Sequence, residues 1–207
     1  MSSVTFIGLG GIARAMAARA IAGGNTVELI ARDAGKARRL ARKLGGGASG
    51  GTVGGVPAGD IVVLAVPYVN TAQVVAHYGD ALAGKVIIDI STPFNAAATG
   101  SVTPLGTSGA QQIAKAVPAS AHVVKAFNTT FGHVLTQGRS LDVFFAGDDA
   151  LAKASVSEFI ESLGLRPFDV GGLDVASWWE AVGPLTTGLA SDDARAFGLS
   201  LGVDPPY

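Results

Sequence analysis

Short apolar runs alternate along this chain with segments in which apolar residues recur every three or four positions. The runs cover residues 4–7, 26–30, 61–66, 86–90, 123–127 and 143–146. The last four are continuous and rich in Val and Ile, which is typical of strands that helices cover on both faces. Between the runs, the spacing predicts helices at residues 34–44, 71–83, 108–116 and 151–163, and a first helix that carries Ile12, Met16 and Ala20.

This alternation predicts an α/β fold, a Rossmann-type doubly wound and mostly parallel sheet with a small C-terminal extension. The segment of residues 166–170 follows the predicted helix at 151–163, and the last segment, residues 174–189, has a helical pattern. We expect residues 1–207 to form a single domain, because no internal repeat or linker divides the alternation.

A glycine-rich motif follows the first apolar run. Gly8, Gly10 and Ala13 form a G-x-G-x-x-A pattern between a predicted strand and a predicted helix. Gly8 permits a tight turn, Gly10 lets the backbone approach a pyrophosphate, and Ala13 lets the helix pack closely on the strand. The helix N-terminus adds N–H donors and a positive dipole end. The motif therefore predicts a dinucleotide cofactor.

The end of the second predicted strand indicates which dinucleotide. A carboxylate there would accept a hydrogen bond from the adenosine 2′-hydroxyl and select NAD. Here the strand ends at Ala31-Arg32, with Lys36 one helical turn beyond, and a guanidinium with an ammonium suits the 2′-phosphate of NADP. Asp33 is expected to cap the next helix instead. The alternative for Arg32 and Lys36 is a solvated helix start.

A glycine-rich tract covers residues 45–55. It leads from a predicted helix back to a strand, which would put it at the N-terminal edge of the sheet. Ligands of such sheets bind at the C-terminal edge. We therefore interpret the tract as a flexible connector and not as a phosphate cradle.

Three other strand ends face the expected cleft, at residues 65–70, 89–93 and 125–131. Each places polar side chains or backbone amides just after a buried strand, where they suit a ribose or carboxamide edge. The alternative is that Ser91, Asn128 and Thr129 only cap the turns that follow.

Composition narrows the functional classes. The chain has 207 residues, 48% of them hydrophobic and 15% charged, with a net charge of −1, so we expect a compact protein with no nucleic-acid partner. Eight of its fifteen basic residues nevertheless lie in the first 43 positions, which would attract a phosphorylated cofactor to that half.

Cysteine is absent, which excludes disulfides, thiolate metal sites and thiol nucleophiles. No apolar run reaches the length of a membrane span, and the first residues show no signal-peptide pattern. We expect a cytoplasmic protein with no metal site and no membrane partner.

Several motifs occur in a fixed order: residues 8–13, Ala31-Arg32 with Lys36, and residues 66–68, 122–129, 146–149 and 163–167. The series resembles the NADP oxidoreductases that use the deazaflavin coenzyme F420, and also the cytosolic reductase domain of the STEAP metalloreductases. The resemblance implies that NADPH lies across the strand ends and exchanges a hydride with a flavin-like ring. It also implies a homodimer, and a role for residues 130–207 in completing the second-substrate pocket.

The motif and the resemblance together give the expected cofactor contacts. They are Gly8, Leu9, Gly10, Gly11, Ile12, Ala31, Arg32, Lys36, Ala65, Val66, Pro67, Asn70, Ser91, Ala126, Asn128 and Thr129. The deazaflavin enzymes often have Thr at the position of Leu9, Ser at Ala31 and His at Asn128. These departures leave the electron acceptor open among coenzyme F420, FMN and FAD.

Hydride exchange with a flavin-like ring needs no nucleophile, so we expect no dedicated catalytic side chain. His77 and His122 are expected at a helix surface and a strand start. His133 follows the Asn128 loop, and the sequence leaves open whether it contacts the second substrate. We expect Trp178 and Trp179 to make packing or dimer contacts.

Two alternatives remain. A hydroxyacid dehydrogenase or pyrroline-5-carboxylate-type reductase shares the opening motif but adds a long helical domain, and a non-catalytic NADPH sensor needs only the binding site.

Overall fold

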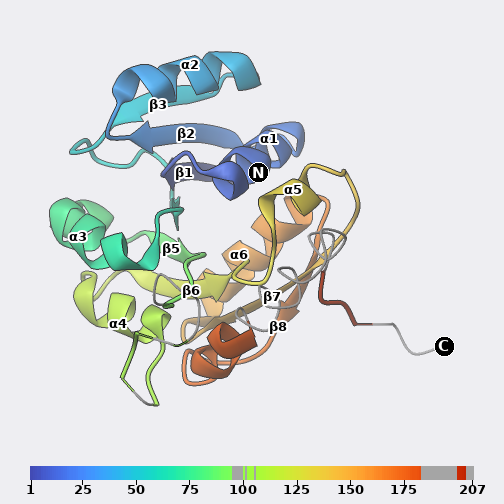
Figure 1. The fold of residues 1–207 in the computed structure, drawn as a ribbon. Helices are drawn as coiled ribbons and strands as arrows, with labels where there is room; N and C mark the ends of the chain where they lie inside the picture. The colour runs from blue at the N-terminus through green and yellow to red at the C-terminus, as the bar shows by residue number, and fades with distance from the viewer. Residues whose placement is uncertain (95–99, 101, 105, 183–199, 204–207) are drawn as a thin grey trace.

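The computed structural model describes residues 1–94, 100, 102–104, 106–182 and 200–203. One sheet runs through this part of the chain and carries helices on both faces (Figure 1). Its strands are β1 Ser3–Ile7, β2 Thr26–Ala31, β3 Ser49–Thr52, β4 Ile61–Leu64, β5 Val86–Asp89, β6 His122–Ala126, β7 Asp142–Gly147 and β8 Arg166–Asp169. The helices are α1 Gly11–Ala22, α2 Ala34–Leu44, α3 Tyr68–Tyr78 with the short η1 Gly79–Leu82, α4 Gly109–Ala116, α5 Gly132–Leu135 and α6 Ala150–Ser162.

The strand order is β3-β2-β1-β4-β5-β6-β7-β8. Every neighbouring pair is parallel except β6 and β7, which are antiparallel. The order reverses at β1, so that the chain winds outward in both directions from the first strand. The predicted Rossmann-type, mostly parallel α/β fold is confirmed.

Local sequence explains where the helices begin. Asp33 accepts a hydrogen bond from the Lys36 N–H and caps α2, as the sequence predicted. Ser108 and Gln111 form a reciprocal capping box at the start of α4. Helix α1 differs, because Gly10 stands at its N-cap and no side chain there accepts a hydrogen bond from its first turn. These backbone donors are therefore left for another partner.

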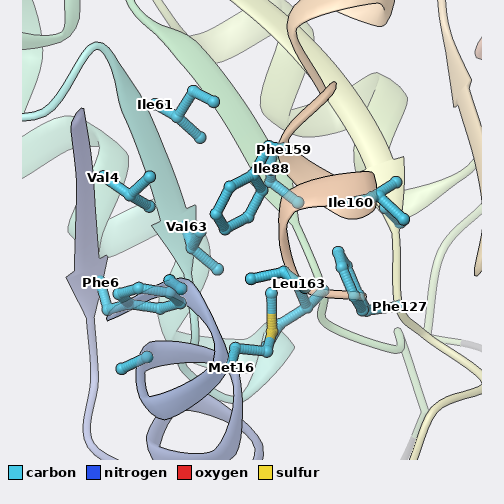
Figure 2. Close-up of a cluster of buried hydrophobic side chains, with 14 of the residues drawn as sticks. Val4, Phe6, Met16, Ile61, Val63, Ile88, Phe127, Phe159, Ile160 and Leu163 are labelled. Atoms are coloured by element: carbon cyan, nitrogen blue, oxygen red, sulfur yellow. The ribbon is translucent and has the colours of Figure 1, made fainter. Parts of the chain in front are cut away.

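Two apolar cores cover the two faces of the sheet. The first lies under α1, α5 and α6 and includes Phe6, Met16, Phe127 and Phe159 (Figure 2). The second lies under α3 and α4 and includes Ile7, Leu64 and Tyr78.

The interpretation of the glycine tract is wrong. Residues 49–52 form the edge strand β3, which pairs in parallel with β2, so Val53 emerges at the C-terminal edge of the sheet. The strand packs closely under α2: a Cβ on Gly50 would lie 2.5 Å from the backbone nitrogen of Arg38. Two of the four residues of β3 are glycines, so the strand is hard to recognise in the sequence. The missing side chains also allow α2 to pack this closely on it.

Other boundaries differ less. Helix α3 begins at Tyr68, directly after Pro67, so the expected loop of residues 65–70 is shorter and Asn70 lies in the first helical turn. The short helix α5 was not predicted. Residues 176–182 are helical, residues 174 and 175 form a turn before them, and residues 183–189 of the expected segment lie outside the described residues.

Candidate functional site

The turn after β1 brings the ends of three strands together. Gly8 has φ +113°, and a Cβ at this position would lie 2.2 Å from the carbonyl oxygen of Ala65. Its N–H donates to the Ile30 carbonyl at 2.9 Å. Only glycine combines this backbone conformation with so close an approach, so Gly8 fixes the ends of β1, β2 and β4 against one another.

The next two glycines face open space. No heavy atom lies within 4 Å of a Cβ built on Gly10 or Gly11. They stand at the uncapped N-terminus of α1, where N–H groups and the helix dipole favour an anion. A pyrophosphate fits this space and these donors.

A cavity of about 490 Å³ opens beside this turn. We call it the strand-end cavity. Its walls come from the ends of β1, β2, β3 and β4 and from α3: Ile7, Gly8, Leu9, Gly10, Ile30, Ala31, Arg32, Val53, Ala65, Val66, Pro67, Asn70, Gln73, Val74, His77 and Tyr78. Mostly apolar walls with a few polar groups suit a flat ring system.

A second hollow of about 630 Å³ shares Leu9, Ala31 and Arg32 with the strand-end cavity. We call it the basic groove, because Arg14, Arg32, Lys36, Arg39 and Lys43 line it. Five cations around one hollow make it suited to a phosphate.

The carboxylates near β2 are already engaged. Glu28 accepts hydrogen bonds from the Thr5 hydroxyl at 2.7 Å and from the Ala58 N–H at 2.9 Å. Asp33 lines the basic groove but its Oδ1 caps α2. The Lys36 N–H, with help from the charges of Arg39 and Lys36, holds the pKa of Asp33 below its usual value. The end of β2 therefore fits a 2′-phosphate better than a 2′-hydroxyl.

Tyr78 brings a buried polar atom to the wall of the strand-end cavity. The residue is 6% exposed, and within the described chain its hydroxyl makes no hydrogen bond of ordinary geometry. Burial raises its pKa, an effect that the nearby Gly54 N–H only partly opposes. A buried hydroxyl without a hydrogen-bond partner of good geometry is costly.

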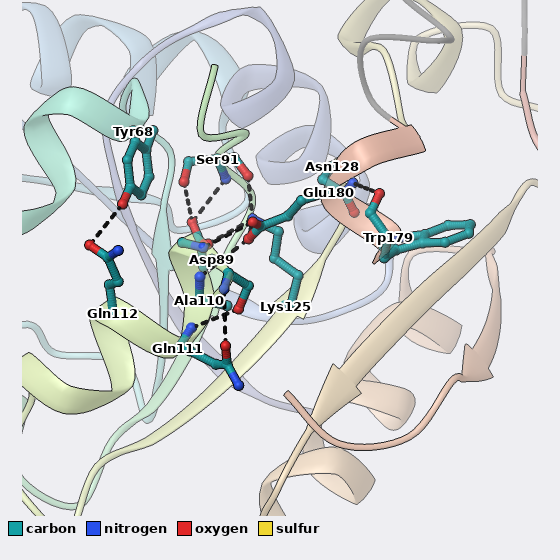
Figure 3. A network of polar contacts seen from close by, with 12 residues as sticks. Tyr68, Asp89, Ser91, Ala110, Gln111, Gln112, Lys125, Asn128, Trp179 and Glu180 are labelled. Atoms are coloured by element: carbon teal, nitrogen blue, oxygen red, sulfur yellow. Dashed lines mark hydrogen bonds and ion pairs between the residues drawn. The ribbon is translucent and has the colours of Figure 1, made fainter. Parts of the chain in front are cut away.

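Charged side chains form a buried cluster where β5 and β6 end (Figure 3). Lys125 lies 2.8 Å from the Asp89 carboxylate and 3.0 Å from that of Glu180, and neither Lys125 nor Asp89 has an exposed side chain. Glu180 comes from the helical segment of residues 176–182 and also accepts from the Gly109 and Ala110 N–H groups of α4. The cluster thus fastens the carboxyl-terminal segment to the strand ends.

The structure brings most predicted cofactor residues to the two hollows. Those lining them are Gly8, Leu9, Gly10, Ala31, Arg32, Lys36, Ala65, Val66, Pro67 and Asn70, while Gly11 and Ile12 begin α1 beside them. That these residues bind a cofactor stays a prediction.

Four predicted residues lie elsewhere. Ser91 is buried and donates its hydroxyl to Asp89 at 2.6 Å, and Ala126 belongs to the core under α1 and α6. Asn128 donates to the Trp179 carbonyl at 3.0 Å. Thr129 is buried beside Phe131 and Leu141.

Sequence reasoning missed several residues that the structure places at the site. Val53, Gln73, His77 and Tyr78 line the strand-end cavity. A helical wheel from Asn70 would have pointed to Gln73 and His77, which lie three and seven positions later. For Glu180, no sequence signal ties it to the strand ends.

Comparison with known proteins agrees with this geometry. The family model described as NADP oxidoreductase, coenzyme F420-dependent, matches residues 3–93. The resemblance seen in the sequence is confirmed. The matched residues run from β1 to just beyond β5 and so include both hollows.

Two curated relatives share parts of the chain. The F420-dependent NADP reductase of Methanocaldococcus jannaschii is 30% identical over 139 residues, which cover 63% of this chain and 62% of that protein. The metalloreductase STEAP3 of Rattus norvegicus is 35% identical over 106 residues, or 50% of this chain and 21% of that protein. The chain therefore matches less than two thirds of the length of either relative.

Solved structures share the fold. A hypothetical protein from Sinorhizobium meliloti is 29% identical with a TM-score of 0.74, covering 84% of this chain and 86% of that one. A putative F420-dependent NADP reductase from Arthrobacter has 23% identity and a TM-score of 0.79, with 93% and 95% of the two chains covered.

Among the described residues, no helix is long and apolar enough to cross a membrane.

Proposed function

We propose that this protein is an NADP(H)-dependent oxidoreductase that exchanges a hydride with a flavin-like substrate, coenzyme F420 or FMN/FAD. The observation that carries the proposal is the basic groove at the end of β2, where Arg32 and Lys36 stand in place of the carboxylate that would select NAD. The groove shares Leu9, Ala31 and Arg32 with the strand-end cavity, so the two hollows adjoin, as an extended dinucleotide requires.

The residues of this chain would divide the binding of NADP(H) among them. Gly10 and Gly11 leave room for the pyrophosphate beside the N–H groups of α1, and Arg32 with Lys36 would bind the 2′-phosphate. Val66 and Pro67 would border the nicotinamide half, on the β4 side of the turn. Such apolar contacts exclude water from the reacting ring.

The bound nicotinamide would supply the chemistry, a hydride for the acceptor ring, and solvent would supply the one proton that completes the reduced acceptor. The protein contributes orientation and close approach. Among the described residues, no group of three or more His, Asp or Glu side chains could hold a metal ion. We propose that the carboxyl-terminal segment, joined to the strand ends through Asn128 and Glu180, completes the acceptor pocket.

Anaerobic oxidation of NADPH by the purified protein tests the proposal, with coenzyme F420, FMN and FAD offered separately and NADH as the control donor. We expect turnover with at least one acceptor and a strong preference for NADPH over NADH. Tight NADPH binding without reduction of any acceptor would instead favour a sensor. Equal use of NADH would contradict the role given to Arg32.

A further inference from the structure

The buried cluster of Lys125, Asp89 and Glu180 carries more negative than positive charge. Its polar atoms are all engaged. Asp89 accepts from the Ser91 N–H at 2.9 Å and from the Ser91 hydroxyl, and Lys125 donates to both carboxylates and to the Ser91 carbonyl. Every contact of the two carboxylates is with a donor, which suits their ionised forms. One ammonium and two carboxylates leave a formal charge of −1.

The N-terminus of α4 offsets part of that charge. The Gly109 N–H donates to Glu180 at 2.9 Å and the Ala110 N–H at 3.2 Å. A helix N-terminus is equivalent to about half a positive charge. The cluster therefore keeps a net negative potential in a region without solvent to screen it.

The register of the sheet places this cluster beside the strand-end cavity. Ile7 pairs with Leu64, Leu64 with Asp89, and Asp89 with Lys125, so these residues form one row across the sheet. Ile7 lines the cavity, and so does Ala65, which follows Leu64. Neighbouring strands are about 5 Å apart, so the Asp89 backbone lies about 10 Å from that of Ile7.

The charges of the cluster also act on Tyr68, the first residue of α3, whose side chain does not line the strand-end cavity. It follows Pro67 in the chain, and its hydroxyl donates to Gln112 at 3.2 Å (Figure 3). Burial raises the pKa of Tyr68, and the charges of Glu180 and Asp89 raise it further. Lys125 opposes them with a smaller effect. At the start of α3 the two carboxylates thus outweigh the lysine.

We propose that the Lys125–Asp89–Glu180 cluster makes the nicotinamide end of the site electrostatically selective for the oxidised cofactor. The inference rests on the proposed function, since it requires NADP(H) to lie with its adenosine over β2 and its nicotinamide beyond β4. The nicotinamide ring of NADP⁺ carries a positive charge, and that of NADPH carries none. A fixed negative potential therefore stabilises NADP⁺, and equally the positive charge that develops on the ring as a hydride leaves.

Glu180 makes this selectivity depend on the carboxyl-terminal segment. Without Glu180 the Lys125–Asp89 pair is formally neutral, so the negative potential exists only while residues 176–182 are docked. Asn128 strengthens the docking through its bond to the Trp179 carbonyl. Glu180 is in this sense a positioning residue that acts on the cofactor through its charge and not by contact.

The test compares the dissociation constants of NADP⁺ and NADPH, measured by isothermal titration calorimetry on the full chain and on Glu180→Gln. The substitution removes the charge and keeps an oxygen for one of the two α4 N–H groups. We expect the ratio of Kd for NADP⁺ to Kd for NADPH to rise by about threefold to tenfold, the order expected for one charge two strands away and partly offset by α4. Glu161→Gln, an exposed charge on α6, is the matched control and should leave the ratio unchanged.

The ratio separates an electrostatic role from a structural one, because looser packing weakens both nucleotides alike. An unchanged ratio in Glu180→Gln would overturn the inference while leaving the proposed function standing. Failure of the unmodified protein to bind either nucleotide would overturn both. If Glu180→Gln does not fold, Asp89→Asn removes one negative charge from the other side of Lys125. The ratio of the two dissociation constants should then rise in Asp89→Asn, and an unchanged ratio would overturn the inference.

Discussion

At the scale of single residues, two glycines of one turn face opposite constraints. Gly8 has a positive φ and a carbonyl oxygen 2.2 Å from the position of its missing Cβ, whereas Gly10 has φ −66° and open space around it. We expect Gly8→Ala to lower the free energy of unfolding by about 3 kcal/mol or more, through strain and overlap. Urea unfolding of the variant measures this loss, and a variant as stable as the original protein would refute the close approach.

Gly10→Ala should have the opposite signature. Its Cβ meets nothing in the protein, so the unfolding midpoint should stay close to that of the unmodified chain. The added methyl group lies where the pyrophosphate would approach, so NADPH affinity should fall by about tenfold or more. Fluorescence titration with NADPH checks this, and unchanged affinity would mean that the cofactor does not cross this turn.

Arg32 and Lys36 should set the preference for the phosphorylated cofactor. Charge-assisted hydrogen bonds contribute about 1.5–3 kcal/mol, so Arg32→Ala should weaken NADPH binding by roughly tenfold to a hundredfold. NADH binding should change little, because NADH lacks the 2′-phosphate. Arg42→Ala, which removes an exposed cation of α2 outside the basic groove, is the control. Equal losses for NADPH and NADH in Arg32→Ala would argue against 2′-phosphate recognition.

Some residues of the site were predictable from the sequence because their chemistry is local. Gly8 and Gly10 lie in the turn before α1, and Arg32 and Asp33 lie in the turn before α2. The structure places each of them where the spacing predicts. Asp89 and Lys125 stood out less, as single charges inside apolar runs. Their partner Glu180 is 55 residues beyond Lys125 and 91 beyond Asp89, a pairing that only the tertiary fold determines.

At the scale of elements, β3 shows how packing can override propensity. Its sequence, Ser-Gly-Gly-Thr, has few strand formers, yet α2 lies so close above it that a Cβ on Gly50 would meet Arg38 at 2.5 Å. Sequence reasoning missed the strand because its glycines resemble a linker. The same glycines bring Val53 to the strand-end cavity, so the error hid part of the site.

We expect Gly50→Ala to destabilise the protein by about 2 kcal/mol, because helix α2 must move away from the strand. Gly55→Ala is the matched control within the same tract, since its Cβ would have only the Thr52 oxygen near it, at 3.8 Å. Thermal or urea unfolding of the two variants measures the difference. Equal stability of both would contradict the close packing of α2 on β3.

Arg19 connects three elements through backbone carbonyls. Its guanidinium donates to Leu135 at 2.8 Å, Leu163 at 2.9 Å and Arg139 at 2.7 Å, tying α1 to the ends of α5 and α6. Losing three such bonds should cost roughly 2 kcal/mol of unfolding free energy in Arg19→Ala. Arg19→Lys keeps the charge but lacks the planar fork, so it should recover little of the loss in urea unfolding. Full recovery by lysine would show that charge alone matters.

At the scale of the whole molecule, the alternation of strands and helices was enough to predict the sheet, because parallel strands buried on both faces leave a continuous apolar signature. Two features were not predictable: the antiparallel direction of β7 relative to β6, and the docking of residues 176–182. Each depends on contacts between distant segments. In the site that we propose, the adenosine half would be encoded near the N-terminus, whereas the nicotinamide half would depend on β4 and on the cluster that joins β5, β6 and the carboxyl-terminal segment.

A crystal structure with NADP⁺ bound would test the central claim most directly. We predict the 2′-phosphate within hydrogen-bonding distance of Arg32 and Lys36, the pyrophosphate at the α1 N-terminus, and the nicotinamide beyond Pro67 toward the cluster of Lys125, Asp89 and Glu180. A nucleotide bound in the reverse direction, or away from the glycine turn, would contradict the assignment of the site.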